Sequence, residues 1–249
     1  MDPVQSPRRR GLIAVMLAAF VLACAGFVAL GLWQVERLGW KEALIARVER
    51  NVNAAPAPLP VPSQWPALTK EDEYRRLQAS GRYDFDREVL VAANTELGAG
   101  FWVLTPLRTR EGPWVLVNRG FVPPELRTQV PRGVPEQSVT GLLRFTEPGG
   151  RPLQKNDPAA GRWYSRDVAA IAAKQGLQGP VTPFFLDARA EPGARDWPRA
   201  GLTVLQFRNH HLVYALTWFA LAAIMAAAIA YLLLDARRAR RLARDPSRC

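Results

Sequence analysis

The sequence predicts a membrane protein of the α+β class, in which two transmembrane helices flank a β-rich extramembrane domain built as an antiparallel sandwich or small barrel with one or two helices. Three observations support this fold. Uncharged apolar runs occupy residues 11–32 and 212–234, near the two ends of the 249-residue chain. Arginines cluster outside both runs, and short β-type segments punctuated by Gly, Pro, Asn and Asp fill the part between them.

Each apolar run is long enough to span a bilayer. The runs contain 22 and 23 residues, and a helix needs about 20 apolar residues to cross the hydrocarbon core. Backbone groups in lipid must bond within the segment, which makes both runs helices. We assign transmembrane helices to residues 11–33 and 209–234. A cleaved signal peptide fits the first run less well, because the run continues past Cys24 to Leu32 with no A-x-A cleavage site.

The charge is sorted around these spans. The chain carries a net charge of +11, and about half of this excess lies in the basic tails, residues 1–10 and 235–249. Arginine-rich flanks stay cytoplasmic, so both termini are expected inside and residues 33–208 in the periplasm. A bacterial inner membrane is favoured because no long Arg- and Ser-rich presequence precedes the first span. The central part has no basic run, so we expect lipid but no nucleic acid as a partner.

The region between the spans divides into three segments. Residues 34–53 continue the first span as an amphipathic helix, and residues 54–66 contain five prolines, typical of an extended connector rather than a helix. Residues 67–208 form the β-rich domain, with one helix capped by Asp167 and ended by Gly176. The expected strands are residues 75–83, 88–92, 101–108, 113–122, 137–146, 181–187 and 203–208.

Motifs of common enzyme classes are missing from the sequence. It has no GxSxG, P-loop, HExxH or GxGxxG motif, and its only histidines are His210 and His211. A hydrolase triad would need a histidine within the outer domain. Cys24 and Cys249 provide neither a disulfide framework nor a zinc site. We therefore expect no enzyme, and the short tails also argue against a membrane sensor with a signalling module.

The start of the second span is the strongest candidate site. On a helix, His211, Tyr214 and Trp218 recur on one face, and a neutral imidazole can ligate haem iron or another metal. Arg208 lies just outside the span, where its guanidinium could pair with haem propionates. His210 projects about 100° away around the helix. One histidine cannot distinguish haem from copper.

The end of the first span offers further candidates at a similar depth, namely Trp33, Gln34 and Arg37. A simpler interpretation remains open for the aromatic residues, because tryptophan, tyrosine and histidine are enriched at membrane interfaces in general. In the outer domain, Arg119 and Arg166 are expected to form structural ion pairs.

Several motifs together resemble the Surfeit locus protein 1 family, over nearly the whole chain. They are residues 31–37 (GLWQVER), 81–84 (GRYD), 117–123 (VNRGFVP), 163–167 (WYSRD), 185–188 (FLDA) and 209–218 (NHHLVYALTW). The last is the most specific. The chain departs from the family pattern at Phe121, where tryptophan is common, at Leu202, where a second glycine is usual, and at His210, which replaces an Asn-like residue.

The resemblance implies an assembly factor for haem-copper cytochrome c oxidase that binds haem a and delivers it to the catalytic subunit. It implies His211 as the axial iron ligand, and cytochrome c oxidase subunit I or haem a synthase as partners. The long farnesyl tail of haem a is costly to expose, at about 0.8 kcal/mol per CH₂, which suits a carrier in the membrane. The alternative is a membrane-anchored scaffold for oxidase subunits that carries no haem itself.

Overall fold

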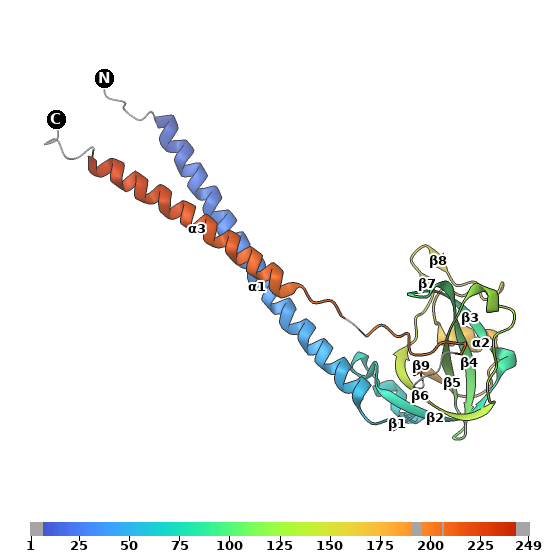
Figure 1. The fold of residues 1–249 in the computed structure, drawn as a ribbon. Helices are drawn as coiled ribbons and strands as arrows, with labels where there is room; N and C mark the ends of the chain where they lie inside the picture. Colours follow the sequence, from blue (N-terminus) through green and yellow to red (C-terminus); the bar gives the residue numbers. More distant parts are fainter. Residues whose placement is uncertain (1–6, 191–195, 206, 243–249) are drawn as a thin grey trace. The chain divides into compact units, whose positions relative to one another are not determined.

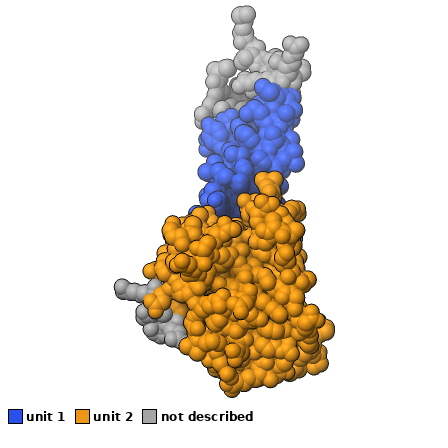
Figure 2. Space-filling view, turned by 90° about the vertical axis from the view of Figure 1, so that its right-hand side faces the viewer, with its two compact units in different colours: residues 1–45, 207–249 blue, residues 46–206 orange. Residues whose placement is uncertain are grey.

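The structure is a computed structural model that describes residues 7–190, 196–205 and 207–242. The outer parts of the two predicted basic tails, residues 1–6 and 243–249, lie outside the described residues. The chain divides into two compact units, residues 1–45 with 207–249 and residues 46–206 (Figures 1 and 2). We refer to them as the helix pair and the barrel unit, and describe each separately.

The helix pair consists of α1 (Pro7–Asn53), which continues into the barrel unit, and α3 (His211–Leu242). Both are long and apolar enough to cross a membrane, as expected for a membrane-anchored protein. The predicted amphipathic extension is the uninterrupted continuation of α1, which passes Gly39 without a break.

Small residues bring α1 and α3 into contact. Gly31 is buried beneath the ring of Phe219, and a Cβ at this position would lie 2.6 Å from a ring carbon. On α3, Ala215 and Ala222 are buried, and the Cys24 thiol lies 3.5 Å from the carbonyl oxygen of Ala222. Helices in lipid gain little from burying apolar surface against each other, so close approach at small residues provides the packing contact.

The barrel unit contains one main sheet with the strand order β1-β2-β6-β9-β5-β4-β3 and an additional pairing between β2 and β4. That pairing closes β2, β6, β9, β5 and β4 into a barrel. The strands are β1 (Ala57–Pro58), β2 (Arg76–Tyr83), β3 (Val89–Thr95), β4 (Gly98–Thr109), β5 (Trp114–Val122), β6 (Glu136–Phe145) and β9 (Val181–Ala188). The predicted β-rich domain between two apolar helices is thereby confirmed.

Two strand pairs are parallel, which the expectation of an antiparallel sheet did not include. β9 pairs in parallel with β5 and antiparallel with β6, and β1 pairs in parallel with β2. For β9 the cause is topological. β5 and β6 run in opposite directions, and β9 lies between them, so β9 must be parallel to one of the two.

Gly81 makes closure of the barrel possible. It is paired with Thr109 of β4 and with Gln137 of β6, at the point where β2 joins both neighbours. A Cβ at Gly81 would lie 2.1 Å from the carbonyl oxygen of Arg108. Glycine in a strand is typical of such close backbone approach.

The core has two layers, which follow from the alternation of side chains along each strand. Residues from all five barrel strands fill the interior: Leu77, Ala79, Tyr83, Leu107, Val115, Val117, Leu143, Phe184 and Leu186. The alternate face packs under α2 (Val168–Lys174), with members Val89, Val91, Leu104, Leu116, Trp163, Val168, Ile171, Ala172, Leu177 and Phe185. The predicted cap is confirmed, because the Asp167 carboxylate accepts a hydrogen bond from the backbone N–H of Ala170 at 3.1 Å.

Three local differences from the sequence predictions stand out. The proline-rich connector is not wholly extended, since it contains β1 and the 3₁₀ helix η1 (Pro62–Ala67). Proline at the first helical position has a φ angle suited to a helical turn. Residues 203–205 and 207–208, expected as a strand, form none. The short elements η2 (Lys70–Asp72), η3 (Phe85–Arg87), η4 (Pro124–Leu126), β7 (Gly150–Arg151) and β8 (Gln154–Lys155) were not predicted.

Candidate functional site

The candidate site of the helix pair is built around His211, the first residue of α3. Its backbone N–H donates to Oδ1 of Asn209 at 3.3 Å, which ties down the start of the helix. The imidazole forms a hydrogen bond with α1, where its Nδ1 lies 2.7 Å from Oε1 of Gln34. Gln34 is buried, with 9% of its surface exposed. One side chain from each helix thus takes part in this polar contact.

This contact determines what the imidazole can do. A carboxamide oxygen only accepts hydrogen bonds, so Nδ1 of His211 donates in this arrangement, and in the neutral imidazole Nε2 then keeps its lone pair. Histidine ligands in metalloproteins are typically oriented in this way, with the second ring nitrogen bonded to an acceptor. The pair of His211 and Gln34 therefore presents a ligand-type nitrogen.

The neighbouring residues before α3 are less constrained. His210 and Arg208 are exposed, and no side-chain partner for either is found within the described residues. Phe207 stacks beneath Lys41 of α1, with the ammonium 4.9 Å from the ring centroid. The chain is thus held to α1 on both sides of His210, and of the two adjacent imidazoles that of His211 forms a hydrogen bond with α1.

Tyr214 and Trp218 have different surroundings. Trp218 is half-buried and stacks on Phe27 of α1 at 5.7 Å between ring centroids. Tyr214 is 56% exposed, and it is Ala215 that is buried one turn below His211. The face of α3 next to α1 therefore contains His211, Ala215 and Trp218, and Tyr214 lies at its edge.

The candidates on α1 form a cluster around Arg37. Its guanidinium lies 6.0 Å from the ring centroid of Trp33 and 5.2 Å from that of Trp40. All three side chains are exposed. Gln34 is the member of this segment that points to α3, and the sequence did not indicate that its partner is His211. A cationic group between two exposed aromatic rings suits the polar edge of a membrane.

In the barrel unit, the ion pair expected for Arg119 is confirmed. Its Nη1 lies 2.8 Å from Oε2 of Glu88, and both side chains are nearly buried. Thr105 donates to the same carboxylate oxygen at 2.6 Å. The guanidinium also lies 4.9 Å above the ring of Phe85 and donates to the carbonyl of Pro131. With these partners, Arg119 has a structural role in the barrel unit.

The ion pair expected for Arg166 is also confirmed, as part of a larger network around Asp187. Arg166 contacts Glu147 at 2.5 Å and Asp187 at 3.3 Å. Arg144 contacts Asp187 at 3.4 Å and Glu73 at 3.0 Å. Asp187 is only 4% exposed, so two arginines share one buried carboxylate.

Other polar groups complete the surroundings of Asp187. Its Oδ1 accepts from the side chain of Asn118 at 2.8 Å, and its Oδ2 accepts from the hydroxyl of Thr203 at 3.1 Å. The network thereby links β5, β6 and β9 to the chain that leads towards α3. The sequence showed Asp187 within the FLDA motif but did not indicate these partners, because they come from distant parts of the chain.

The network also affects the titration of Glu147. Burial raises the pKa of this carboxyl group, but hydrogen bonds and ion pairing from Arg166 outweigh that effect and leave the pKa below its ordinary value. In the barrel interior, burial raises the pKa of Tyr83 well above that of a free phenol. Glu147 is therefore ionised, and Tyr83 neutral, at physiological pH.

Comparison with known proteins identifies the family. Residues 21–223 match the sequence model of the SURF1 family. Surfeit locus protein 1 of Rattus norvegicus is 34% identical over 215 residues, covering 78% of this chain and 68% of the relative. The Homo sapiens protein of the same name is 34% identical over 218 residues, with coverages of 78% and 69%.

A more distant organism provides the most complete overlap of the three. A SURF1-like protein of Monosiga brevicollis is 33% identical over 238 residues, covering 88% of this chain and 86% of the relative. The family match includes the contact of His211 with Gln34 and the whole barrel unit. The chain therefore belongs to the SURF1 family, whose members are known as cytochrome c oxidase assembly factors.

Proposed function

We propose that this protein binds haem a at the end of its helix pair and delivers it to the catalytic subunit of cytochrome c oxidase. The observation that carries the proposal is the contact of 2.7 Å between Nδ1 of His211 and Oε1 of Gln34. It leaves Nε2 as a nitrogen suited to axial ligation of haem iron. When bound, haem a would supply the redox-active iron that the oxidase requires.

The residues around His211 suit the rest of such a ligand. Trp33 and Tyr214 are exposed aromatic side chains near this level of the helices, and they could lie against an apolar macrocycle. Arg37 and Arg208 are exposed, and arginine pairs well with carboxylates such as haem propionates. We assign these four residues to haem contacts and Gln34 to positioning of the imidazole.

Release is as important for a carrier as binding. A single axial histidine can be exchanged for a ligand of the receiving subunit more readily than a pair of histidines. The farnesyl tail would stay in lipid, since its transfer to water costs about 0.8 kcal/mol per CH₂. A site at the end of two membrane helices meets both requirements. Family membership also suggests a non-enzymatic role.

The proposal includes a location and partners. We place both termini in the cytoplasm of a bacterium and residues 33–208 in the periplasm, on the basis of the arginines that flank both spans. The carrier would receive haem a from haem a synthase and pass it to cytochrome c oxidase subunit I. Lipid surrounds the helix pair, whose apolar side chains are largely exposed.

The experiment is a haem-loading assay on the full chain. The protein is co-expressed with the enzymes of haem a synthesis, purified in a mild detergent, and analysed by absorption and pyridine haemochrome spectra. We expect the wild type and His210→Ala to carry haem a, and His211→Ala to lose it while still inserting into the membrane. Full haem content in His211→Ala would remove the carrier mechanism.

The same assay separates the scaffold alternative. A colourless wild-type protein that still co-purifies with an oxidase subunit would favour a scaffold over a haem carrier. Membrane insertion and the content of folded barrel unit are checked in every sample, so that loss of haem is not confused with loss of protein.

A further inference from the structure

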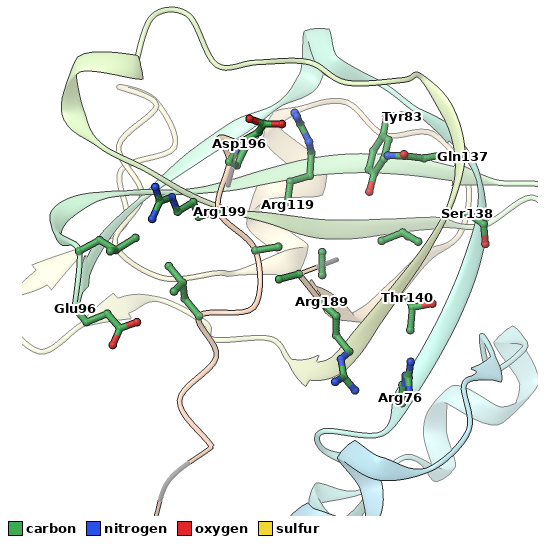
Figure 3. Close-up of a pocket in the computed structure, with 17 residues that line it drawn as sticks. Arg76, Tyr83, Glu96, Arg119, Gln137, Ser138, Thr140, Arg189, Asp196 and Arg199 are labelled. Atoms are coloured by element: carbon green, nitrogen blue, oxygen red, sulfur yellow. The ribbon is translucent and has the colours of Figure 1, made fainter. Parts of the chain in front are cut away.

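A cavity of about 670 Å³ lies in the barrel unit, beside the part of β6 that extends beyond the end of β9 (Figure 3). Ala188, the last residue of β9, pairs with Gly141 of β6. The backbone N–H of Arg189 then donates to the carbonyl of Thr140 at 3.1 Å. Within the described residues, positions 136–139 of β6 have no strand neighbour on this side. The cavity opens beside this unpaired edge.

The other wall of the cavity is a short stretch of chain, residues 196–202, which we call the return segment. Arg199 exchanges two backbone hydrogen bonds with Phe121 of β5, each of 2.9 Å, and Gly201 donates to the carbonyl of Ala188 at 3.2 Å. Gly120 has a φ of +134°, and a Cβ there would lie 2.3 Å from the backbone of Arg199. The return segment is therefore closely seated on β5.

Two arginines that line this cavity have no counter-ion among residues 7–190, 196–205 and 207–242. Within the described residues, the only buried side-chain nitrogen or oxygen atoms without a hydrogen-bond partner are Nε of Arg76 and Nε of Arg199. Both arginines line the cavity. The guanidinium of Arg199 rests 4.7 Å above the ring of Trp197, and neither arginine forms an ion pair with a described residue. The Nε atoms of both cations are thus removed from water without an acceptor in the part of the chain that the structure describes.

The remaining charges of the cavity are arranged around these two arginines. Arg189 is exposed and uses one nitrogen to cap the end of α1, donating to the carbonyl of Val52 at 3.2 Å. Glu96 and Asp196 are exposed, and Arg119 is already paired as described above. Figure 3 shows Arg76 and Arg189 together at one side of the cavity, with Arg199 and Glu96 towards the other.

Partial burial of a cation is costly unless an anion or several acceptors compensate it. Guanidinium groups pair best with the oxygens of carboxylates and phosphates. We propose that this cavity binds a small organic dianion, one anionic group meeting Arg76 and Arg189 and the other meeting Arg199. The volume lies within the range of small-molecule sites. The site belongs to the barrel unit and does not depend on haem binding.

Isothermal titration calorimetry on the full chain in a non-ionic detergent tests the proposal. Succinate and inorganic phosphate are the probes, and acetate at matched ionic strength is the monoanionic reference. We expect succinate to bind at least about tenfold more tightly than acetate, and Arg76→Gln and Arg199→Gln each to weaken it by about tenfold. Arg162→Gln is the matched control, since Arg162 is an exposed arginine outside the cavity that pairs with Asp157.

Two outcomes would overturn the proposal. One is that succinate, phosphate and acetate bind with equal affinity. The other is that the affinity for succinate is the same in both cavity variants as in the wild type. If Arg199→Gln fails to fold, Arg189→Gln replaces it, because Arg189 is exposed. Nanodiscs with and without phosphatidic acid identify the source of the anion. If succinate binds more weakly in nanodiscs that contain phosphatidic acid than in nanodiscs without it, the site is assigned to a lipid headgroup. If succinate binds equally in both, the site is assigned to a soluble dianion.

Discussion

The barrel unit and the helix pair stabilise themselves in opposite ways. In the barrel unit, large apolar side chains such as Leu107, Phe184 and Leu186 are completely buried. In the helix pair, large apolar side chains such as Leu12 and Leu216 are more than 60% exposed, and the buried residues are small or polar. The hydrophobic effect therefore organises the barrel. The helix pair needs lipid around it, and its two helices are joined by close packing and by the hydrogen bond between the side chains of His211 and Gln34.

The same contrast applies to the polar groups. Arg119, Arg144 and Arg166 of the barrel unit each have carboxylate partners. The imidazole of His211 in the helix pair has one hydrogen-bond partner among the described residues, Gln34, and retains a second ring nitrogen for a ligand. These three arginines therefore have structural roles in the barrel unit, whereas His211 at the start of α3 can still bind a ligand. Four predictions follow this contrast, in order of decreasing effect.

The largest effect on folding is expected for Asp187→Ala. The change leaves Arg144 and Arg166 without their shared buried partner, and breaking a buried ion pair typically costs about 3–5 kcal/mol. Urea unfolding followed by tryptophan fluorescence measures the loss. Arg110→Gln, which breaks an exposed pair with Glu136, serves as control and should cost no more than about 1 kcal/mol. Similar stabilities of the two variants would show that the network is not structural.

A smaller loss is expected for Gly120→Ala. The added Cβ would face both a φ of +134° and the backbone of Arg199 at 2.3 Å, so strain and overpacking together should cost about 2–4 kcal/mol. Gly112→Ala is the matched control, because its φ is +111° and nothing lies within 4 Å of the added atom. Thermal unfolding of both variants separates the cost of the steric clash with Arg199 from the cost of placing alanine at a positive φ. Equal losses of stability in the two variants would mean that the return segment moves away from β5 without cost.

At the haem site proposed for the helix pair, Gln34→Leu should change haem content rather than stability. Leucine retains the packing but cannot accept a hydrogen bond from Nδ1 of His211, and loss of such a partner costs about 10- to 100-fold in metal affinity. Titration of haem into the detergent-solubilised protein measures this change. Unchanged affinity would exclude a positioning role for Gln34, without bearing on His211 itself.

The smallest effect concerns the pH dependence of the barrel unit. The pKa of Glu147 is lower in the folded protein than the ordinary value of about 4.5 for a glutamate, because Arg166 donates hydrogen bonds to its carboxylate and pairs with its charge. Its ionised form therefore stabilises the fold at pH values above about 4.5, and this contribution is lost as the pH falls below that value through the folded-state pKa. Unfolding free energies of the wild type between pH 6 and about 3 should fall more steeply than those of Glu147→Gln. Parallel curves would contradict the role assigned to Arg166.

Features within single segments were predictable from the sequence. The two apolar helices, the β-rich region and the helix after Asp167 depend on residues close to one another in the chain, such as an uninterrupted apolar run or a cap and a terminating glycine. The ion pairs of Arg119 and Arg166 were also anticipated, although their partners were not. His211 was identified as a candidate by its residue type and its place at the membrane boundary.

Only the tertiary structure decided how distant segments combine. The insertion of β9 between β5 and β6, the closure of the barrel at Gly81, the sharing of Asp187 by two arginines and the contact of Gln34 with His211 all join residues far apart in the chain. Local propensity contains no information on such pairings, because the same strand or helix can form next to many neighbours. The sequence by itself predicted the two apolar helices and pointed to His211 as a candidate ligand, and only the tertiary structure decided that Nδ1 of this residue contacts Gln34.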